Sequence, residues 1–527
     1  MRGEGEARAA ASAYLHGLRV PIAIVAAACA LLCGAAAAQA SLEPVLRGSV
    51  ANAKALSGAT AVAVAGGYAY VTGYYSGELV VADLSHPRPH IVGRTPVARS
   101  LVDATNVAVS GTLAYVVSKN RNTDEASGGN DDGTGNSLTI VDVSQPTAPR
   151  IVGTLHDPVD LFGAYGIAVD GDYAYVASQG CLHGQPCPNA KVGDSFTVVD
   201  VSDPSDPRVV ATLQNSNLPL PWRGSGALKH ATSVALSGGF AYVTAAYTNR
   251  LTVIDVSDPL HPAIVASLED DEQLAFPVDV AVEDGYAYVA DQYSGLGRVA
   301  VVDVHDPTAP QVVASVTDPT WLDGAYRIRA QGDFVFVSAA YAEAVAVIDV
   351  SDPTSPRIAG GVQSPELLNH TTGIDVGPAA RSVIASSPLL STETQTNYPP
   401  FPLQAGGPTA TGTVSSIVLD PAPLRVRIPS TERPTRSVTT PDATFGFVTT
   451  DDIAALRCSL DAAPLAPCDS PTSQSYSGLS PGSHTFTVEA TDPAGDIASA
   501  SWSWVVRAPR PGAPGWADLV RRLAGEL

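Results

Sequence analysis

One phrase recurs along this chain with small changes. It reads FTVVDVSDPSDPRVVATL at residues 196–213, and close copies occupy 251–268, 299–316 and 345–362. A further copy lies at 138–155 and a looser one at 79–95. The Asp of the phrase serves as a marker for six units: Asp83, Asp142, Asp200, Asp255, Asp303 and Asp349. Because successive markers are 46 to 59 residues apart, the period is too long for a helical solenoid and is typical of a β-propeller blade.

Each unit contains four short apolar runs. In the third unit they are YGIAV, DYAYVAS, FTVVDVS and RVVATL. The runs are rich in β-branched and aromatic residues, and Gly, Asp and Pro separate them, which is the pattern of short antiparallel strands. The Asp that closes the third run occurs in every unit, so we interpret it as a structural cap and not as a site residue.

A seventh, weaker unit follows the six clear ones. TGIDVGPAARSVIASS supplies its first two strands, and TVSSIVLDPAPLRVRI supplies the third and fourth. Near the other end, EPVLRGSV at 43–50 looks like a fourth strand with no unit before it. This segment either completes the seventh unit or lies against it. The sequence therefore predicts an all-β chain with a seven-bladed β-propeller of four-stranded blades over residues 41–428.

The phrases YAYV and VIDVSDP resemble the LVIVD-repeat family of exported β-propeller proteins over residues 43–428. That resemblance implies the fold and an extracytoplasmic location, but no single activity and no shared catalytic residues. Residues 429–507, with CSLDAAPLAPC and GSHTFTVEATD, resemble the Ig-like β-sandwich domains of bacterial surface proteins. Residues 508–527 are expected to form a Pro-rich tail with a short amphipathic helix.

The first 40 residues have the pattern of a secretory signal peptide. Arginines precede the apolar run VPIAIVAAACALLCGAAAA, and small residues precede a predicted cut after Ala40. A lipoprotein cut before Cys29 is the alternative. Since an exported chain meets oxidising conditions, we expect two local disulfides, Cys181–Cys187 and Cys458–Cys468. The mature chain is therefore expected outside the cell or at the cell envelope, without a transmembrane span.

The charge of the chain restricts its partners. It has 30 Lys and Arg against 52 Asp and Glu, for a net charge of −22. A surface this acidic argues against nucleic acid and anionic lipid as ligands. A protein or carbohydrate at the cell exterior is the expected partner.

Comparison of the first strand across the units shows two positions that face the axis. Most units carry small residues at both. Units five to seven instead carry Asp279, Arg327, Arg329 and Asp375. Because unpaired charges near an axis are costly, we expect two structural ion pairs between neighbouring units, Arg329–Asp375 and Arg327–Asp279.

Three residues nearer the strand start, the same comparison places Asp103, His230 and His370 at the expected mouth of the axial channel. Two imidazoles and a carboxylate suit zinc and similar metals, or they form a polar rim for an anionic or sugar ligand. Local loop structure is the third interpretation. Trp222 and Arg223, in the turn before unit four, are further candidates for ligand contact, although Trp222 could simply pack its loop down.

No catalytic signature for a nucleophile, a phosphate loop or a zinc protease occurs in the chain. We therefore expect a binding or interaction scaffold and favour a protein that is not an enzyme, with no catalytic residue and no cofactor. The propeller face would present a ligand site, and the Ig-like module would act as a spacer or adhesion element. The alternative is an extracellular metal-dependent hydrolase or lyase, with a divalent metal on Asp103, His230 and His370.

Overall fold

The computed structural model describes residues 43–86, 88–119, 135–180, 193–292, 297–377, 382–388, 412–420, 426–428, 433–435, 437–449, 455–461, 463–491 and 497–508. The predicted signal segment and tail lie outside these residues, as do Cys181 and Cys187. No helix in the described ranges is long and apolar enough to cross a membrane.

The described residues form an all-β, propeller-like arrangement with seven four-stranded antiparallel sheets. Six of them use four strands in chain order: β2 (Ala59–Ala65), β3 (Tyr68–Gly73), β4 (Leu79–Asp83) and β5 (His90–Arg94); β6 (Ala104–Ser110), β7 (Leu113–Ser118), β8 (Ser137–Asp142) and β9 (Arg150–His156); β10 (Ala164–Asp170), β11 (Tyr173–Ser178), β12 (Ser195–Asp200) and β13 (Arg208–Gln214); β14 (Ala231–Ser237), β15 (Phe240–Ala245), β16 (Arg250–Asp255) and β17 (Ala263–Glu269); β18 (Pro277–Glu283), β19 (Tyr286–Asp291), β20 (Arg298–Asp303) and β21 (Gln311–Thr317); β22 (Ala325–Gln331), β23 (Phe334–Ala339), β24 (Ala344–Asp349) and β25 (Arg357–Gln363).

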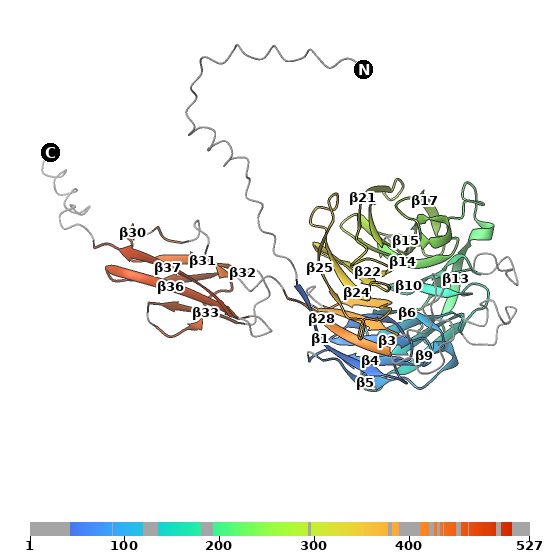
Figure 1. The fold of residues 1–527 in the computed structure, drawn as a ribbon, viewed down its shortest axis with the longest axis horizontal. Coiled ribbons are helices and arrows are strands. Elements are labelled where there is room, and N and C mark those ends of the chain that lie inside the picture. The colour runs from blue at the N-terminus through green and yellow to red at the C-terminus, as the bar shows by residue number, and fades with distance from the viewer. Residues whose placement is uncertain are drawn as a thin grey trace, which may run out of the picture. The chain divides into compact units, whose positions relative to one another are not determined.

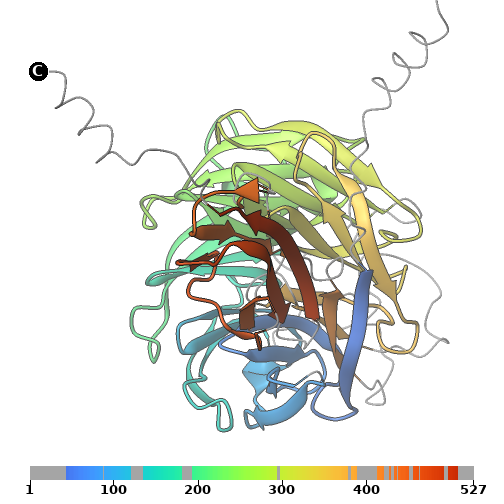
Figure 2. The ribbon, with the colours of Figure 1, turned by 90° about the vertical axis from the view of Figure 1, so that its left-hand side faces the viewer.

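The remaining sheet joins segments that are far apart in the sequence. It contains β26 (Gly373–Val376), β27 (Ser382–Ser387) and β28 (Gly412–Asp420), and its fourth strand is β1 (Glu43–Asn52), which pairs antiparallel with β28. Both ribbon views draw β1 beside β28 (Figures 1 and 2). Of the two expectations for residues 43–50, the structure therefore shows the one in which they complete the sheet.

One expectation for this sheet is wrong. LRVRI was expected as its outer strand, but Val426–Arg427 (β29) pairs with Val448–Thr449 (β32). The position beside β28 is already occupied by β1, so the chain after Asp420 has no free strand edge to pair with there.

The first strands of the seven sheets pack in a closed order. Each contacts the next in the series β2, β6, β10, β14, β18, β22 and β26, and β26 contacts β2.

The repeated Asp and the turn after it hold the end of each third strand. In the third sheet, Asp200 Oδ1 accepts the backbone N–H of Ser202 at 2.9 Å, and Asp203 Oδ1 accepts that of Ser205 at 2.9 Å. These bonds lower the pKa of Asp200, first through the Ser202 hydroxyl and then through its backbone N–H. The marker Asp is thus a turn cap, as its presence in every unit indicates.

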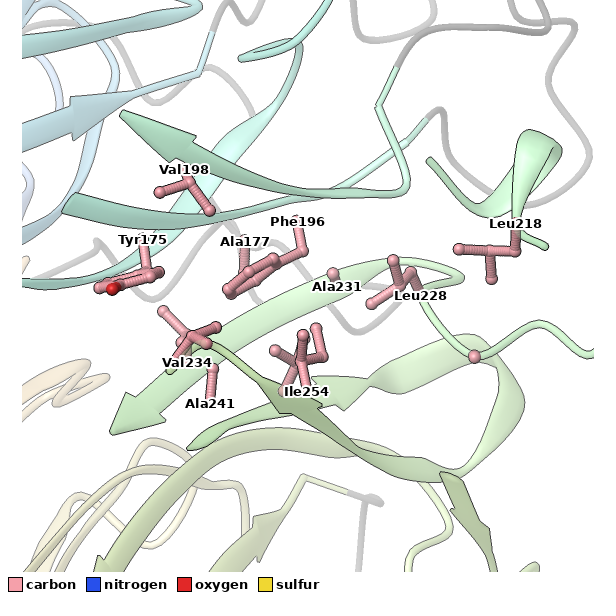
Figure 3. Packing of buried hydrophobic residues seen from close by; sticks show 13 residues of the cluster. Tyr175, Ala177, Phe196, Val198, Leu218, Leu228, Ala231, Val234, Ala241 and Ile254 are labelled. Carbon is pink, nitrogen blue, oxygen red and sulfur yellow. The ribbon is translucent and has the colours of Figure 1, made fainter. Parts of the chain in front are cut away.

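Apolar side chains fill the space between neighbouring sheets. Between the third and fourth sheets, Phe196 and Val198 of β12 pack with Val234 and Ile254 of β14 and β16, and all are buried (Figure 3). Alternate residues of each strand enter these layers, which is why the runs are apolar on both faces. The layers keep the first strands in fixed positions around the axis.

The C-terminal residues form separate sheets with their own core. A five-stranded sheet has the order β30 (Ser437–Val438), β37 (Ile497–Val506), β36 (Gly482–Thr491), β33 (Ala455–Leu460) and β34 (Ala466–Pro467), and β31 (Ala443–Gly446) pairs with β35 (Ser473–Tyr476). Phe445, Phe447, Phe486 and Trp504 are its largest buried side chains. Cys458 and Cys468 are joined as a disulfide in this part of the chain.

Candidate functional site

The residues predicted for the channel mouth share a backbone conformation. Six of the seven equivalent positions before the first strands have a positive φ between 51° and 71°. They are Gly58, Asp103, Gly163, His230, Gly324 and His370. Phe276 at the seventh position is not among them. Asp and His tolerate this left-handed region better than most side chains, although Gly is preferred. Asp103, His230 and His370 therefore replace Gly at a turn position of the repeat.

The turn packs against a tyrosine that recurs in several sheets, two residues after the end of the second strand. Tyr75 lies so close over Gly58 that a Cβ there would be 2.8 Å from its ring, and Tyr341 covers Gly324 in the same way at 2.6 Å. In the fourth sheet the ring of Tyr247 stacks on that of His230, with 3.9 Å between centroids and 16° between planes. His230 thus contributes an aromatic support for Tyr247.

Burial decides what these imidazoles can do. His230 is fully buried, and burial followed by the nearby charges of Lys119 and Lys229 lowers its pKa to about 3. His370 is 6% exposed, its Nδ1 lies 3.2 Å from Asn369 Oδ1, and burial lowers its pKa. Burial therefore favours the neutral form of both rings.

The three predicted metal ligands do not come together. Within the described ranges, no group of three His, Cys, Asp or Glu side chains could hold a metal ion. Asp103, His230 and His370 come from sheets two, four and seven, and their shared turn conformation fixes each one in its own sheet. The expected metal set is accordingly not assembled by this backbone.

Partly exposed aromatic rings lie beside these turns and at the start of the first strands. We call Tyr75, Tyr247, Phe276, Tyr326 and Tyr341 the aromatic mouth; they come from the first, fourth, fifth and sixth sheets. Tyr247 and Phe276 lie 5.9 Å apart between centroids. Burial, and after it the charge interaction with Tyr326, raises the pKa of Tyr341.

Six of the first strands, β2, β6, β10, β14, β18 and β22, begin with a β-bulge that leaves one extra residue in the strand. In the third sheet, Ala164 pairs with Ser178 and Gly166 with Ala177, so Tyr165 is the extra residue. Most other sheets have Thr here, and Thr60 and Thr105 donate hydrogen bonds to the next sheet, to the carbonyls of Ala104 (2.8 Å) and Ala164 (3.0 Å). A bulge of this kind turns one side chain out of the regular alternation.

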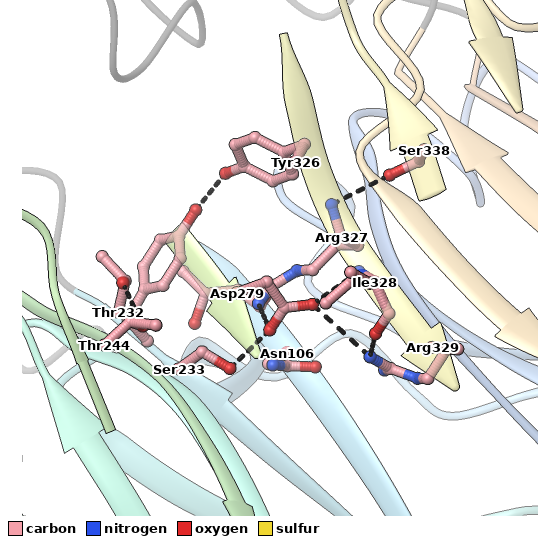
Figure 4. A network of polar contacts seen from close by, with 12 residues as sticks. Asn106, Thr232, Ser233, Thr244, Asp279, Tyr326, Arg327, Ile328, Arg329 and Ser338 are labelled. Atoms are coloured by element: carbon pink, nitrogen blue, oxygen red, sulfur yellow. Dashed lines mark hydrogen bonds and ion pairs between the residues drawn. The ribbon is translucent and has the colours of Figure 1, made fainter. Parts of the chain in front are cut away.

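In the third and sixth sheets the bulge residue is Tyr, and the two side chains meet. The hydroxyls of Tyr165 and Tyr326 are hydrogen-bonded (Figure 4). The guanidinium of Arg327 lies 5.4 Å from the centroid of the Tyr165 ring and 5.6 Å from that of Tyr326. A small enclosed cavity beside them, with room for about one water molecule, is lined by Tyr165, Thr232, Phe276, Val278, Gln292, Tyr326 and Arg327.

Arg327 and Asp279 form the buried ion pair expected from the sequence. Arg327 is 3% and Asp279 2% exposed, and Arg327 Nη1 lies 3.5 Å from Asp279 Oδ1. The carboxylate also accepts the backbone N–H of Ile328 at 2.9 Å and the hydroxyl of Ser233 (Figure 4). Burial is the largest influence and lowers the pKa of Arg327, but Asp279, Tyr165 and Tyr326 together outweigh it and the pKa is raised. The pair keeps a fixed cation beneath the mouth.

The second expected pair is less buried and is part of the same network. Arg329 Nε lies 3.0 Å from Asp375 Oδ1, and Arg329 Nη1 lies 3.5 Å from Asp279 Oδ2. Asp375 also accepts the backbone N–H of Val64 from the first sheet at 2.6 Å. Arg329 is 31% exposed as a side chain. The two pairs therefore connect the fifth, sixth, seventh and first sheets.

The other predicted contact residues are occupied with local structure. Trp222 Nε1 donates to the carbonyl of Ile264 at 3.1 Å, and its ring packs against the core between the third and fourth sheets. Arg223 Nε lies 3.5 Å from the carbonyl oxygen of Leu218. The structure thus places Trp222 in the role of a loop anchor.

Sequence comparison missed the aromatic mouth, although a signal was present. TGYY at 72–75, TAAY at 244–247 and SAAY at 338–341 all end in the mouth tyrosine, and ADQY at 290–293 repeats the pattern with a Tyr outside the described residues. The bulge tyrosines were missed for a different reason. Side chains in a regular strand alternate between its two faces, and a β-bulge shifts this alternation by one residue. A comparison of every second residue along the strand therefore passes over the side chain that the bulge turns toward the axis.

The LVIVD repeat family matches residues 58–94, 103–122, 133–157, 163–182, 190–214, 229–270, 278–318 and 324–364. These ranges cover the first six sheets, so the chain contains an LVIVD-repeat propeller. No curated protein matches the chain.

Several solved structures are similar at low identity. A Lactobacillus plantarum protein shares 17% identity with a TM-score of 0.46 and covers 62% of this chain and 86% of its own. A protein of unknown function from Desulfotomaculum acetoxidans shares 14% at 0.42, covering 58% and 85%. Hydrazine synthase of Kuenenia stuttgartiensis shares 14% at 0.43, covering 63% and 92%.

Proposed function

We propose that this LVIVD-repeat propeller is a secreted or cell-envelope binding scaffold that holds a small ligand at its aromatic mouth. We further propose that the seven four-stranded sheets are the seven blades of one ring, and that the C-terminal sheets are an Ig-like module that acts as a spacer or adhesion element. A non-catalytic role is part of the proposal.

The observation that carries the proposal is the support beneath three of the mouth tyrosines, Tyr75, Tyr247 and Tyr341. Tyr247 is half-exposed, while the imidazole stacked in parallel on one of its faces is fully buried. The imidazole therefore fixes one face of this partly exposed ring. Tyr75 and Tyr341 lie on glycines that leave no space for a Cβ. Rings with one face fixed by the protein lose little entropy when a ligand covers the other.

The polar network below makes the mouth rigid. Asp279, Arg327, Arg329 and Asp375 connect neighbouring sheets, and the Tyr165–Tyr326 hydrogen bond joins the third sheet to the sixth. Binding sites are most effective when the residues that contact the ligand are held by a second set of packed contacts. The connections between sheets supply such a set here.

Export is supported by two features. The leader-like first 40 residues have the composition of a signal peptide, and Cys458–Cys468 is joined as a disulfide, a bond that persists in oxidising compartments. The mature chain should begin at Ser41. Intact-mass analysis of the secreted, non-reduced protein after thiol alkylation should find no alkylated cysteine; two or more, or a lipid on Cys29, would contradict this part of the proposal.

The ligand site is tested by removing mouth rings. We expect compounds that raise the melting temperature of the wild-type protein in a library of extracellular metabolites and saccharides to lose their effect on a Tyr247→Ala, Tyr341→Ala variant. Tyr173→Ala is the matched control, because Tyr173 is also half-exposed but begins β11 at the opposite end of a second strand. If every such compound acts equally on the mouth variant, the proposal is wrong.

A further inference from the structure

The small cavity beneath the aromatic mouth contains two unsatisfied polar atoms of opposite kind. Gln292 is 2% exposed and its Oε1, an acceptor, has no hydrogen-bond partner among the described residues. Arg327 is 3% exposed and its Nε, a donor, likewise has none in the part of the chain described. Both residues line the cavity. Leaving such groups unpaired is costly, so this cavity is built for a polar group that is absent from the protein itself.

The chemistry of that group follows from the two atoms. It must donate a hydrogen bond to Gln292 Oε1 and accept a hydrogen bond from the N–H of Arg327 Nε, and the cavity has room for about one water-sized group. A carboxylate cannot donate and an ammonium cannot accept. A hydroxyl does both from a single oxygen.

The charge around the cavity excludes a simple anion site. The guanidinium of Arg327 is already paired with Asp279, which also accepts from Ile328 and Ser233. The whole chain carries a net charge of −22, and this field repels anions. A neutral ligand avoids both costs.

The rings above the cavity add the remaining requirement. Phe276 and Tyr326 line the cavity and belong to the aromatic mouth, and Tyr247 lies 5.9 Å from Phe276. A ligand with a hydroxyl in the cavity therefore has an apolar face against aromatic rings. Pyranose sugars combine a ring face of C–H groups with hydroxyls at the ring edge, which is the complement of this arrangement.

We infer that the aromatic mouth binds a neutral carbohydrate, with the pyranose face on the mouth rings and one hydroxyl in the cavity between Gln292 and Arg327. This inference rests on the proposed function, because it names the ligand class of the same site. The sequence left both a protein and a carbohydrate as expected partners, and the inference selects the carbohydrate.

The test uses full-length protein and four defined probes: the neutral trisaccharides cellotriose and maltotriose, the anionic trigalacturonate, and N-acetyl-tryptophanamide as an aromatic compound without a sugar. Saturation-transfer NMR detects binding, and calorimetry gives the affinity. We expect one or both neutral trisaccharides to bind, and Tyr247→Ala to weaken them by about tenfold or more. Tyr173→Ala should leave them unchanged.

A second variant examines the cavity. Gln292→Leu keeps the size of the side chain but removes the acceptor, and it should weaken the neutral trisaccharide by about five- to tenfold. Because the mouth rings are intact in this variant, N-acetyl-tryptophanamide, if it binds, should be unaffected. A Gln292→Leu variant that binds the trisaccharide as well as wild type would overturn the placement of a hydroxyl in the cavity.

The remaining outcomes separate the two proposals. If only trigalacturonate or N-acetyl-tryptophanamide binds, and Tyr247→Ala abolishes it, the neutral-sugar inference is wrong while the mouth remains the binding site. If a neutral trisaccharide binds and Tyr247→Ala, Tyr341→Ala retains it fully, the mouth is not the site and both proposals are wrong. If neither of the two neutral trisaccharides binds, the inference is overturned.

Discussion

The buried pair of Asp279 and Arg327 offers the sharpest test of the structural reasoning, through the change Asp279→Ala. The variant removes the charge that lies 3.5 Å from Arg327 Nη1 and leaves the guanidinium 3% exposed. Among the described residues, the polar contact left to the guanidinium is the bond from Nη2 to the carbonyl of Thr105 at 3.3 Å. The two tyrosine rings at 5.4 and 5.6 Å compensate only part of the loss.

We expect Asp279→Ala to lower the free energy of unfolding by about 3–5 kcal/mol, the usual cost of leaving one buried charge without its partner. The double change Asp279→Ala, Arg327→Ala should recover at least half of that loss, because no uncompensated charge remains. The small side chains fit, since the first sheet carries Ala61 at this position. Arg329→Ala should cost only about 1 kcal/mol: Arg329 is 31% exposed, and Asp375 keeps the backbone N–H of Val64.

Urea unfolding followed by far-UV circular dichroism measures these differences, with calorimetry to separate the transition of the C-terminal sheets. A double-mutant cycle then gives the coupling between Asp279 and Arg327, which we expect to exceed about 2 kcal/mol. If the loss in the double variant equals the sum of the two single losses, the residues do not stabilise each other and the reasoning is refuted.

Three further changes test other parts of the fold. Deleting residues 43–52 removes the strand β1 that completes its sheet, so the propeller transition should fall by several degrees in calorimetry; an unchanged transition would mean that the ring closes without it. Gly324→Ala should cost more than Gly332→Ala in urea unfolding, because both have positive φ (70° and 58°) but only the former meets the Tyr341 ring; equal losses would refute the packing argument. The pKa of His230 is about 3 in the folded protein against about 6.5 unfolded, so its contribution to stability is complete above about pH 6.5 and is lost at about 1.4 kcal/mol per pH unit below it. His230→Asn should therefore show a shallower loss of stability between pH 6 and 4 than wild type, and identical slopes would contradict the assignment.

The sequence by itself determined the repeated sheet. The marker Asp with its two-proline turn ends each third strand through bonds between neighbours in the chain, so local chemistry is enough to reveal it. The ion pairs could also be found, because Asp279, Arg327, Arg329 and Asp375 break a rule that the other units obey at the same strand position. The resemblance between 43–50 and a fourth strand pointed to β1, since the fourth-strand pattern is carried by the segment itself.

The tertiary structure alone decided what the site is made of. Asp103, His230 and His370 look like ligands in a sequence, but each occupies the left-handed turn position that Gly fills in other units, and the ring of His230 stacks on Tyr247 there. Tyr165 and Tyr326 are distant in the chain and meet only because their sheets stand on opposite sides of a ring, with a bulge that reverses strand parity. A sequence repeat reveals the contacts that every unit makes within itself and with adjacent units. An axial site is instead made from the few positions at which the units differ. Those positions come together only when the sheets close into the propeller.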